Sequence, residues 1–321
     1  MQFRTQITIQ KTKSPIDYHS KMVSIGSCFA ENMAQKFDYF KFQNIANPFG
    51  IMFNVISIEN IIDRIVANKL FAEKDIFFHN DAWHCFEVHS CLSHPDKDIF
   101  IDQLNLILLQ TKGYFSDATH FIFTFGTSWI YRNVANNKVV ANCHKMAQSH
   151  FKKELISIEA TLKSIENIIL MITSINPKAN FIFTVSPVRH IKDGFFENNV
   201  SKGILHQAFF SVLHSQELRG ATNNIEIFPS FEIIMDELRD YRFFEVDMLH
   251  PNQIAIDYVW QQFVSSNINS NTQIGLKKVE AIQKMLSHRS INSNAEATKK
   301  LEQKIQIDVQ LLNNSNPEII F

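Results

Sequence analysis

The sequence predicts an α/β fold in which helices flank a mostly parallel sheet as a three-layer αβα sandwich. Apolar runs of strand length alternate with longer stretches of helical periodicity, which is the pattern of such a fold. The expected strands cover residues 21–26, 120–126, 180–185 and 225–229. The second and third of these runs are continuously apolar, as expected for strands that are buried on both faces.

The stretches between the expected strands have the spacing of amphipathic helices. In the first of them, apolar residues recur at i, i+3, i+4 and i+7, which places them on one helical face. These residues are Ala30, Met33, Ala34 and Phe37. The expected helices lie at about residues 28–40, 55–69, 99–112, 151–175 and 200–217.

Three further features complete the expected fold. Residues 76–90 read as a hairpin turned at Asn80-Asp81 and inserted at the edge of the sheet. A last core helix is expected after His250, with Pro251 in its first turn, where a missing N–H has no cost. No internal repeat interrupts this order.

The C-terminal part differs in composition from the rest of the chain. After residue 265 the sequence is rich in Ser and Asn, which predicts a linker, and two charged amphipathic helices follow at about residues 275–288 and 295–313. We therefore expect one domain over residues 1–265 and a linker with a helical extension over 266–321. The extension would pack on the core or on a second copy of the chain as a homodimer.

Composition and charge exclude several classes of protein. The 321 residues are 45% hydrophobic and 20% charged, and 31 basic residues nearly balance 32 acidic ones. No basic run is interleaved with aromatic residues, so we expect no nucleic-acid partner. We find neither a signal-peptide core nor a run of about 18 apolar residues, so we expect a cytoplasmic protein without a membrane partner. The four cysteines include no C-x-x-C pair and fit reduced thiols in that compartment.

A hydroxyl and a thiol stand where the first strand passes into the first helix. Ser27 follows the strand directly, so its Oγ is expected at the carboxyl edge of the sheet, next to the partial positive charge of a helix N-terminus. This is a suitable place for a nucleophile, although a helix N-cap is the simpler role for such a serine. Cys28 is an alternative nucleophile. Its side chain leaves the helix about 100° further round, so we expect a small core residue there.

A serine nucleophile needs a base with an orienting carboxylate. The segment Asp247-x-x-His250 supplies both on a short turn. With this spacing Asp247 can accept from one ring nitrogen while the other nitrogen faces the site. The motif is short, and its meaning depends on the rest of the sequence.

Five sequence blocks together resemble the GSCFA family, a branch similar to the SGNH or GDSL hydrolase superfamily. The blocks are GSCFA at 26–30, NPFG at 47–50, FGTSW at 125–129, SPVRH at 186–190 and DMLHP at 247–251. The resemblance covers roughly residues 20–265 and implies a flavodoxin-like, SGNH hydrolase-like fold. It also implies a nucleophile at Ser27, a backbone oxyanion donor at Gly50, an orienting Asp247 and a basic His250.

The chain departs from the superfamily at the third block. Where many SGNH enzymes have Gly-x-Asn-Asp, this chain has Gly126-Thr127-Ser128. The asparagine donor is missing, and loss of one oxyanion donor costs roughly a hundredfold or more in rate. Ser128 could replace it with a hydroxyl. Asn47 is another candidate donor, with an Asn-Pro turn as its simpler role.

Arg189 follows a buried strand and is expected on the same rim as Ser27 and His250. Its planar guanidinium suits an anionic or polyhydroxylated part of a substrate, and the alternative is an ion pair with Asp193 or Glu197. We expect a structural role for the neighbouring His190.

A metal site is not expected. The histidines and cysteines of residues 84–94 do not match the ligand spacing of known zinc sites, and His84 and His89 would face opposite sides of a strand. The expected function is therefore cofactor-free hydrolysis of an ester, with a small acyl group such as acetyl on a carbohydrate or related alcohol implied as the substrate. Acyl transfer with the same residues, and a non-catalytic binding module that has lost turnover, are the alternatives.

Overall fold

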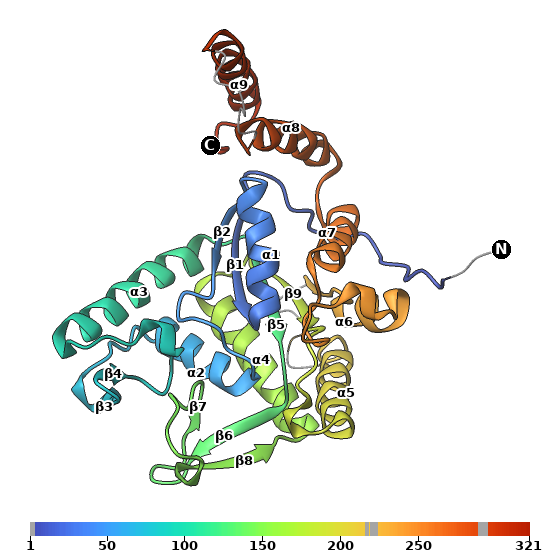
Figure 1. Ribbon diagram of the computed structural model, residues 1–321. Coiled ribbons are helices and arrows are strands. Elements are labelled where there is room, and N and C mark those ends of the chain that lie inside the picture. Colours follow the sequence, from blue (N-terminus) through green and yellow to red (C-terminus); the bar gives the residue numbers. More distant parts are fainter. Residues whose placement is uncertain (1–3, 216–217, 219–223, 288–294) are drawn as a thin grey trace.

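A five-stranded parallel sheet forms the centre of the molecule (Figure 1). The computed structural model describes residues 4–215, 218, 224–287 and 295–321. The strand order is β10-β9-β5-β1-β2, and every pair of neighbours is parallel. The strands are β1 (Lys21–Gly26), β2 (Gln43–Ala46), β5 (His120–Phe125), β9 (Asn180–Val185) and β10 (Ile225–Ile227). The predicted α/β class and the four predicted strands are confirmed.

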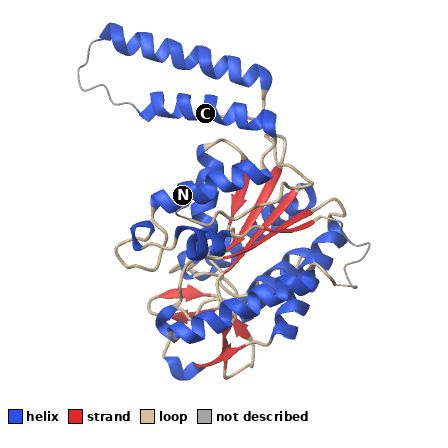
Figure 2. Ribbon diagram, turned by 90° about the vertical axis from the view of Figure 1, so that its right-hand side faces the viewer, coloured by secondary structure: helices blue, strands red, loops and turns tan. Residues whose placement is uncertain are grey.

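Helices cover both faces of this sheet (Figure 2). Alternate side chains of β5 show the division, because Phe121 and Phe123 belong to one apolar cluster and Ile122 to the other. The first cluster includes side chains of α2 (Val55–Val66), α3 (Lys97–Asp117), α4 (Ile158–Ile175) and α5 (Phe195–Val212). The second includes those of α1 (Cys28–Tyr39) and α7 (Gln253–Asn267). The five predicted core helices are therefore present, with shifted ends.

Stacked phenylalanines join the two central strands. Phe121 lies beside Phe181 with ring centroids 5.8 Å apart, and Phe123 lies beside Phe183 at 5.4 Å. Each such pair adds about 0.5–1.5 kcal/mol beyond the burial of its area. The strand ends that carry the candidate site are thus held by a well-packed core.

The predicted hairpin is present, but it does not extend the central sheet. Strands β3 (Phe77–His79) and β4 (Ala82–His84) form an antiparallel pair of their own. The turn residues Asn80 and Asp81 have φ of 45° and 58°, as the tight hairpin turn with two left-handed residues requires. The expected place at the sheet edge was wrong, because β2 occupies that edge.

A small antiparallel sheet replaces the start of one predicted helix. It contains β6 (Trp129–Asn133), β7 (Val139–Val140) and β8 (Phe151–Leu155) in the order β7-β6-β8. The predicted helix at 151–175 begins only at Ile158, because the Ser157 side chain caps it and residues 151–155 pair with β6. Pairing with a strand distant in sequence makes this segment a strand, although its local periodicity is that of a helix.

Short helical turns complete the described chain. These are 3₁₀ turns at Glu73–Asp75, Ser90–Leu92, Gln148–His150, Ile191–Asp193 and Tyr241–Phe243, and α6 (Ser230–Glu232) with a π-helical turn at Ile233–Leu238. None of the helices in the described ranges is both long and apolar enough to cross a bilayer.

Two helices extend the molecule beyond the central sheet (Figures 1 and 2). They are α8 (Ser270–Ser287) and α9 (Ala295–Ser315). The expected linker after residue 265 is largely helical, because α7 runs to Asn267 and α8 starts at Ser270. Buried Leu276 and Leu312 pack in the same cluster as Phe37 of α1. The Ser- and Asn-rich composition of the start of α8 gave no indication of this buried apolar face.

Candidate functional site

A cavity of about 570 Å³ lies at the carboxyl ends of the central strands. Cys28 comes to it from the start of α1, Thr127 from the segment after β5, and His190 from the segment after β9. His250, which precedes α7, lines the same cavity. Parallel strands end at one edge of a sheet, so segments far apart in sequence meet there.

Asp247 and His250 form a close pair at this cavity. Oδ2 of Asp247 lies 2.6 Å from Nδ1 of His250, and its Oδ1 accepts from the backbone N–H of Leu249 and of His250 at 2.8 and 3.0 Å. These backbone hydrogen bonds and the imidazole lower the pKa of Asp247 to about 2. The carboxylate is therefore ionised at neutral pH and can only accept a hydrogen bond, so in the neutral form of the imidazole Nδ1 carries the proton and Nε2 the lone pair.

The turn that carries this pair is closed by its own backbone. The N–H of Glu245 donates to the carbonyl of His250 at 2.7 Å, and Met248 adopts a left-handed conformation with φ of 61°. We had expected Pro251 in the first turn of α7, which was wrong. Asn252 caps the helix, so Pro251 lies before it. The side chains of Asp247 and His250 are 46% and 45% exposed. The pair is fixed in geometry yet open to a ligand.

Ser27 is placed as a helix cap. It is 0% exposed, and its Oγ accepts from the N–H of Phe29 at 3.3 Å. Its own N–H donates to the carbonyl of Thr124 at 3.0 Å. Ser27 is not among the residues that line the cavity. The cap is thus observed, and the role of Ser27 as a nucleophile stays a prediction.

Cys28 lies where Ser27 was expected. Its side chain is only partly buried and lines the cavity, so the expectation of a core residue was wrong. The step of about 100° round the helix turns this side chain toward the strand ends and not toward the sheet. Burial raises the pKa of the Cys28 thiol, and hydrogen bonds from the backbone N–H of Phe29 and of Cys28 offset part of this effect.

Lys202 is a buried cation beneath the cavity that the sequence did not reveal. It lies on α5, is 2% exposed, and its Nζ donates to the carbonyls of Gly126 and Ser186 at 2.6 and 2.7 Å. Within the described ranges no carboxylate pairs with it. Burial lowers its pKa to about 7, and the charge of Cys28 acts in the opposite direction. A lysine within a helical pattern is normally expected on the surface, so the sequence does not indicate that Lys202 is buried.

Two of the predicted oxyanion donors take part in a turn beside β1. The N–H of Gly50 donates to the carbonyl of Asn47 at 2.7 Å. The Asn47 side chain accepts from the N–H of Gly26 at 2.8 Å and so holds the end of β1. Neither Gly50 nor Asn47 lines the cavity. Their proposed role would require this turn to open.

The residues after β5 are tied to α5. Ser128 is 0% exposed, its Oγ donates to the carbonyl of Ser201 at 2.9 Å, and its N–H donates to Oγ of Ser201 at 2.7 Å. Thr127 Oγ1 lies 2.9 Å from the same hydroxyl, and the N–H of Gly126 donates to Phe53 at 2.8 Å. Of the three, only Thr127 lines the cavity. The Ser128 hydroxyl is therefore committed to structure here.

Arg189 and His190 both line the cavity. His190 was expected to be structural, yet its buried Nε2 has no hydrogen-bond partner in the described part of the chain. Burial, then the charges of Lys202 and His250, lower the pKa of His190 to about 3, so the ring is neutral at neutral pH. Asp193, one of the acids suggested for Arg189, pairs with Lys153.

The histidines near the hairpin form an aromatic cluster. Both ring nitrogens of His84 are engaged, with Oγ of Ser93 at 2.6 Å and the carbonyl of His79 at 2.9 Å. The His84 ring also packs against that of His144 in a tilted arrangement, with ring centroids 4.7 Å apart. Among the residues that the structure describes, no group of three His, Cys, Asp or Glu side chains is arranged to hold a metal ion.

Comparison with known protein families identifies the family of this chain. The sequence model of the GSCFA family matches residues 21–263. The chain belongs to the GSCFA family. The matched range of this GSCFA protein contains β1, the turn with Asp247 and His250, and most of α7. A search of the curated proteins finds no match. Family membership does not by itself define a reaction, so function has to be argued from the site.

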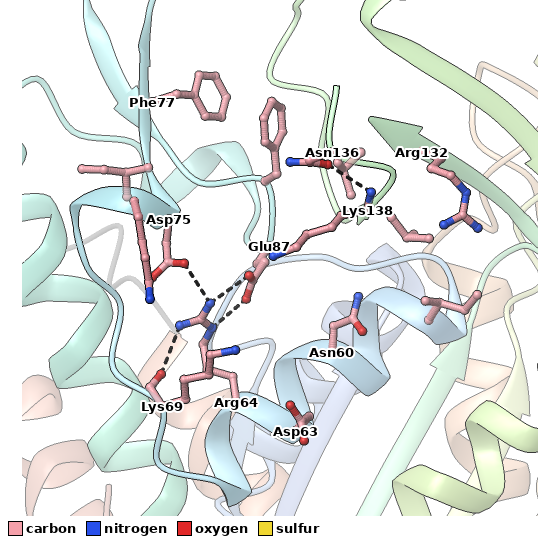
Figure 3. A pocket seen from close by; sticks show the side chains of 16 residues that line it. Asn60, Asp63, Arg64, Lys69, Asp75, Phe77, Glu87, Arg132, Asn136 and Lys138 are labelled. Atoms are coloured by element: carbon pink, nitrogen blue, oxygen red, sulfur yellow. Dashed lines mark hydrogen bonds and ion pairs between the residues drawn. The ribbon is translucent and has the colours of Figure 1, made fainter. Parts of the chain in front are cut away.

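A second cavity of the GSCFA protein, about 480 Å³ in volume, lies around Arg64 of α2 (Figure 3). The Arg64 side chain is 4% exposed and contacts Glu87 twice, at 2.6 and 2.8 Å, and Asp75 at 3.4 Å. One terminal nitrogen also donates to the carbonyls of Lys69 and Leu70. Because protein groups occupy the guanidinium, this cluster holds α2 to the hairpin segment.

We expect Arg64→Met to lower the free energy of unfolding by about 3 kcal/mol, because it leaves two partly buried carboxylates without their cation. Arg132→Met is the matched control. Arg132 pairs with Glu154 at a more exposed site, so we expect a loss of about 1 kcal/mol or less. Urea unfolding of both variants measures the difference. Equal losses would contradict the structural role of Arg64.

Proposed function

We propose that this GSCFA protein hydrolyses acyl esters in the cavity at the carboxyl edge of its sheet. The observation that carries the proposal is the Asp247–His250 pair, which leaves Nε2 of His250 as a base in the cavity that the N-terminus of α1 also lines. A helix N-terminus favours negative charge, as the oxyanion of acyl transfer requires. The function rests on this combination of base, orienting carboxylate and helix end.

The strand order supports an SGNH hydrolase-like architecture. Numbered along the central sheet alone, the strands β2-β1-β5-β9-β10 have the order 2-1-3-4-5 of flavodoxin-like folds. In such folds ligands bind outside the carboxyl ends of the strands, which is where the cavity lies. We propose residues 1–265 as the hydrolase-like domain and residues 266–321 as its extension.

The mechanism we propose is two-step acyl transfer. A side chain of the Ser27-Cys28 turn gives its proton to Nε2 of His250 and attacks the acyl carbonyl. Asp247 stabilises the imidazolium that forms, and the imidazolium then protonates the leaving alcohol. Water repeats the sequence on the acyl-enzyme and releases the acid. No metal or organic cofactor takes part in this scheme.

A small acyl ester of a carbohydrate or related alcohol is the proposed substrate. The cavity volume of about 570 Å³ falls within the range of about 300–1,000 Å³ that is typical of small-molecule sites. Arg189 lines it and offers a planar set of donors to hydroxyl or anionic groups. Trp129 and Tyr131 add aromatic surface.

Release of p-nitrophenol from p-nitrophenyl acetate tests the proposal. We expect activity in the unaltered protein and a loss of about 10²–10⁴-fold in His250→Ala, the size of a general-base contribution. His214→Ala is the control, because His214 is exposed in the turn after α5, where its ring contacts the backbone carbonyl of Phe210. Adding an alcohol acceptor and analysing products separates hydrolysis from acyl transfer. An inactive, folded protein would refute the proposal.

A non-catalytic binding module is the second candidate. Its motivation is the engagement of Gly50 N–H and of the Ser128 hydroxyl in hydrogen bonds away from the cavity. Such a protein would bind an acylated sugar, measured by calorimetry, without forming any covalent acyl intermediate.

A further inference from the structure

We infer that the thiol of Cys28, and not the hydroxyl of Ser27, is the nucleophile of the proposed reaction. The inference rests on the proposed function and names the atom that receives the acyl group. The two residues are adjacent, yet the structure separates them. Cys28 lines the cavity with His250, whereas Ser27 is 0% exposed and absent from the cavity wall.

The hydroxyl of Ser27 already has a structural task. Its Oγ accepts from the N–H of Phe29, and its backbone N–H and carbonyl are bonded to Thr124 and Ala30. To attack a substrate, Ser27 would have to abandon the cap and turn out of a fully buried position. Loss of the cap destabilises the start of α1, and the substrate carbonyl would also have to enter the interior. Cys28 needs no such change, since its side chain already faces the cavity.

The surroundings of Cys28 suit a sulfur nucleophile. It is the first residue of α1, so the helix dipole and the nearby N–H groups favour a thiolate and an adjacent oxyanion. The buried cation Lys202 acts on the thiol in the same direction. Burial and the negative charge of Glu31 act in the opposite direction, and the net effect raises the pKa of the thiol, so Cys28 is protonated at neutral pH and needs a base. His250 supplies that base on the same cavity.

The other three cysteines lack this combination. Cys143 also lines the cavity, but burial raises its pKa to about 11 and it lies in a loop with no helix N-terminus. Cys91 is exposed away from the cavity, and Cys85 is fully buried in the core. Cys28 is thus the thiol that joins a helix end, a buried cation and the cavity of the base.

The chemical step balances without an oxidant or a reductant. The Cys28 S–H proton passes to Nε2 of His250 as sulfur bonds to the acyl carbon. The C–O bond to the alcohol breaks, and the alcohol leaves with that proton. Water then loses a proton to Nε2 and attacks the thioester. The C–S bond breaks, the acid departs, and the thiol regains its proton.

The test compares single variants with p-nitrophenyl acetate as substrate and far-UV circular dichroism as the check on folding. We expect Cys28→Ala to reduce turnover to the level of His250→Ala, whereas Ser27→Ala loses much less. Cys91→Ala is the control with unchanged activity. Cys28→Ser keeps the size of the side chain and would retain a small part of the activity, because a hydroxyl is the weaker nucleophile.

Alkylation distinguishes a nucleophilic role of Cys28 from a structural one. We expect iodoacetamide to modify Cys28 with loss of activity, p-nitrophenyl acetate to slow this modification, and His250→Ala to change its pH dependence. Peptide mapping identifies the modified residue. Turnover that survives in Cys28→Ala but not in Ser27→Ala would overturn the inference and leave the proposed function intact. Absence of turnover in the unaltered, folded protein would overturn both.

Discussion

Asp247→Asn should lower the rate of acyl-ester hydrolysis by about 10⁴-fold, the loss seen when a triad carboxylate becomes an amide. The reason lies in the turn. Oδ1 of Asp247 already accepts two backbone N–H groups, so the carbonyl oxygen of an asparagine would take that place. Its NH₂ group would then face Nδ1 of His250 and force the ring proton onto Nε2. The base would lose its lone pair while the turn kept its shape.

Asp240→Asn is the matched control for this experiment. Asp240 lies in the same segment, and its Oδ1 also accepts a backbone N–H, from Arg242, but it does not contact His250. We expect its activity to equal that of the unaltered protein. Steady-state rates with p-nitrophenyl acetate and the unfolding midpoint of each variant separate catalysis from stability. Equal rates in the two asparagine variants would refute the orienting role of Asp247.

Lys202→Met should remove a pH-dependent part of the stability. The pKa of Lys202 is about 7 in the folded protein, below the usual lysine value of 10.5, so between these values the unfolded chain binds one more proton. Stability must therefore rise with pH above 7, by up to about 1.4 kcal/mol per pH unit. Below pH 7 both states are protonated and this contribution is constant. We expect the rise to vanish in Lys202→Met.

Urea unfolding of both proteins between pH 7 and about 8.5 measures the difference between their slopes. The unfolded cysteines titrate in the upper part of this range, but both proteins carry them. The pKa of His190 is lowered to about 3, so this histidine changes the stability with pH only below pH 7 and does not affect the slope measured here. Lys278→Met is the control, because Lys278 is exposed on α8. A Lys202→Met variant with the same slope as the unaltered protein would show that burial does not lower the pKa of this amine.

The central strands could be predicted because their sequences are unambiguous. β5 and β9 are buried on both faces and therefore read as continuous apolar runs. β2 was missed, since its four half-buried residues, Gln-Asn-Ile-Ala, lack both a long run and a strand composition. β8 was mistaken for helix because only its pairing with β6 defines it. Strands that depend on a distant partner leave little trace in local sequence.

The candidate site divides in the same way. The spacing Asp247-x-x-His250 made their contact foreseeable, because three residues on one turn bring the two side chains together. The direction of Cys28 depends on how α1 leaves the sheet, and the sequence pattern does not contain that angle. Lys202 reaches the site only because α5 packs beneath the ends of β5 and β9. The catalytic roles of all these residues stay predictions.

The two apolar clusters have a consequence for synthesis on the ribosome. The first cluster draws its buried side chains from Val23 to Leu218, so it can close before the C-terminal helices are made. The second joins Ile16 and Tyr18 to Leu312 and Ile319. Chains emerge N-terminus first and domains fold as they appear. Phe37 of α1 packs against Trp260 and Phe263 of α7. The apolar face of α1, made among the earliest residues, is therefore covered only after α7 has been made, and a chaperone that binds nascent chains has that interval in which to bind it.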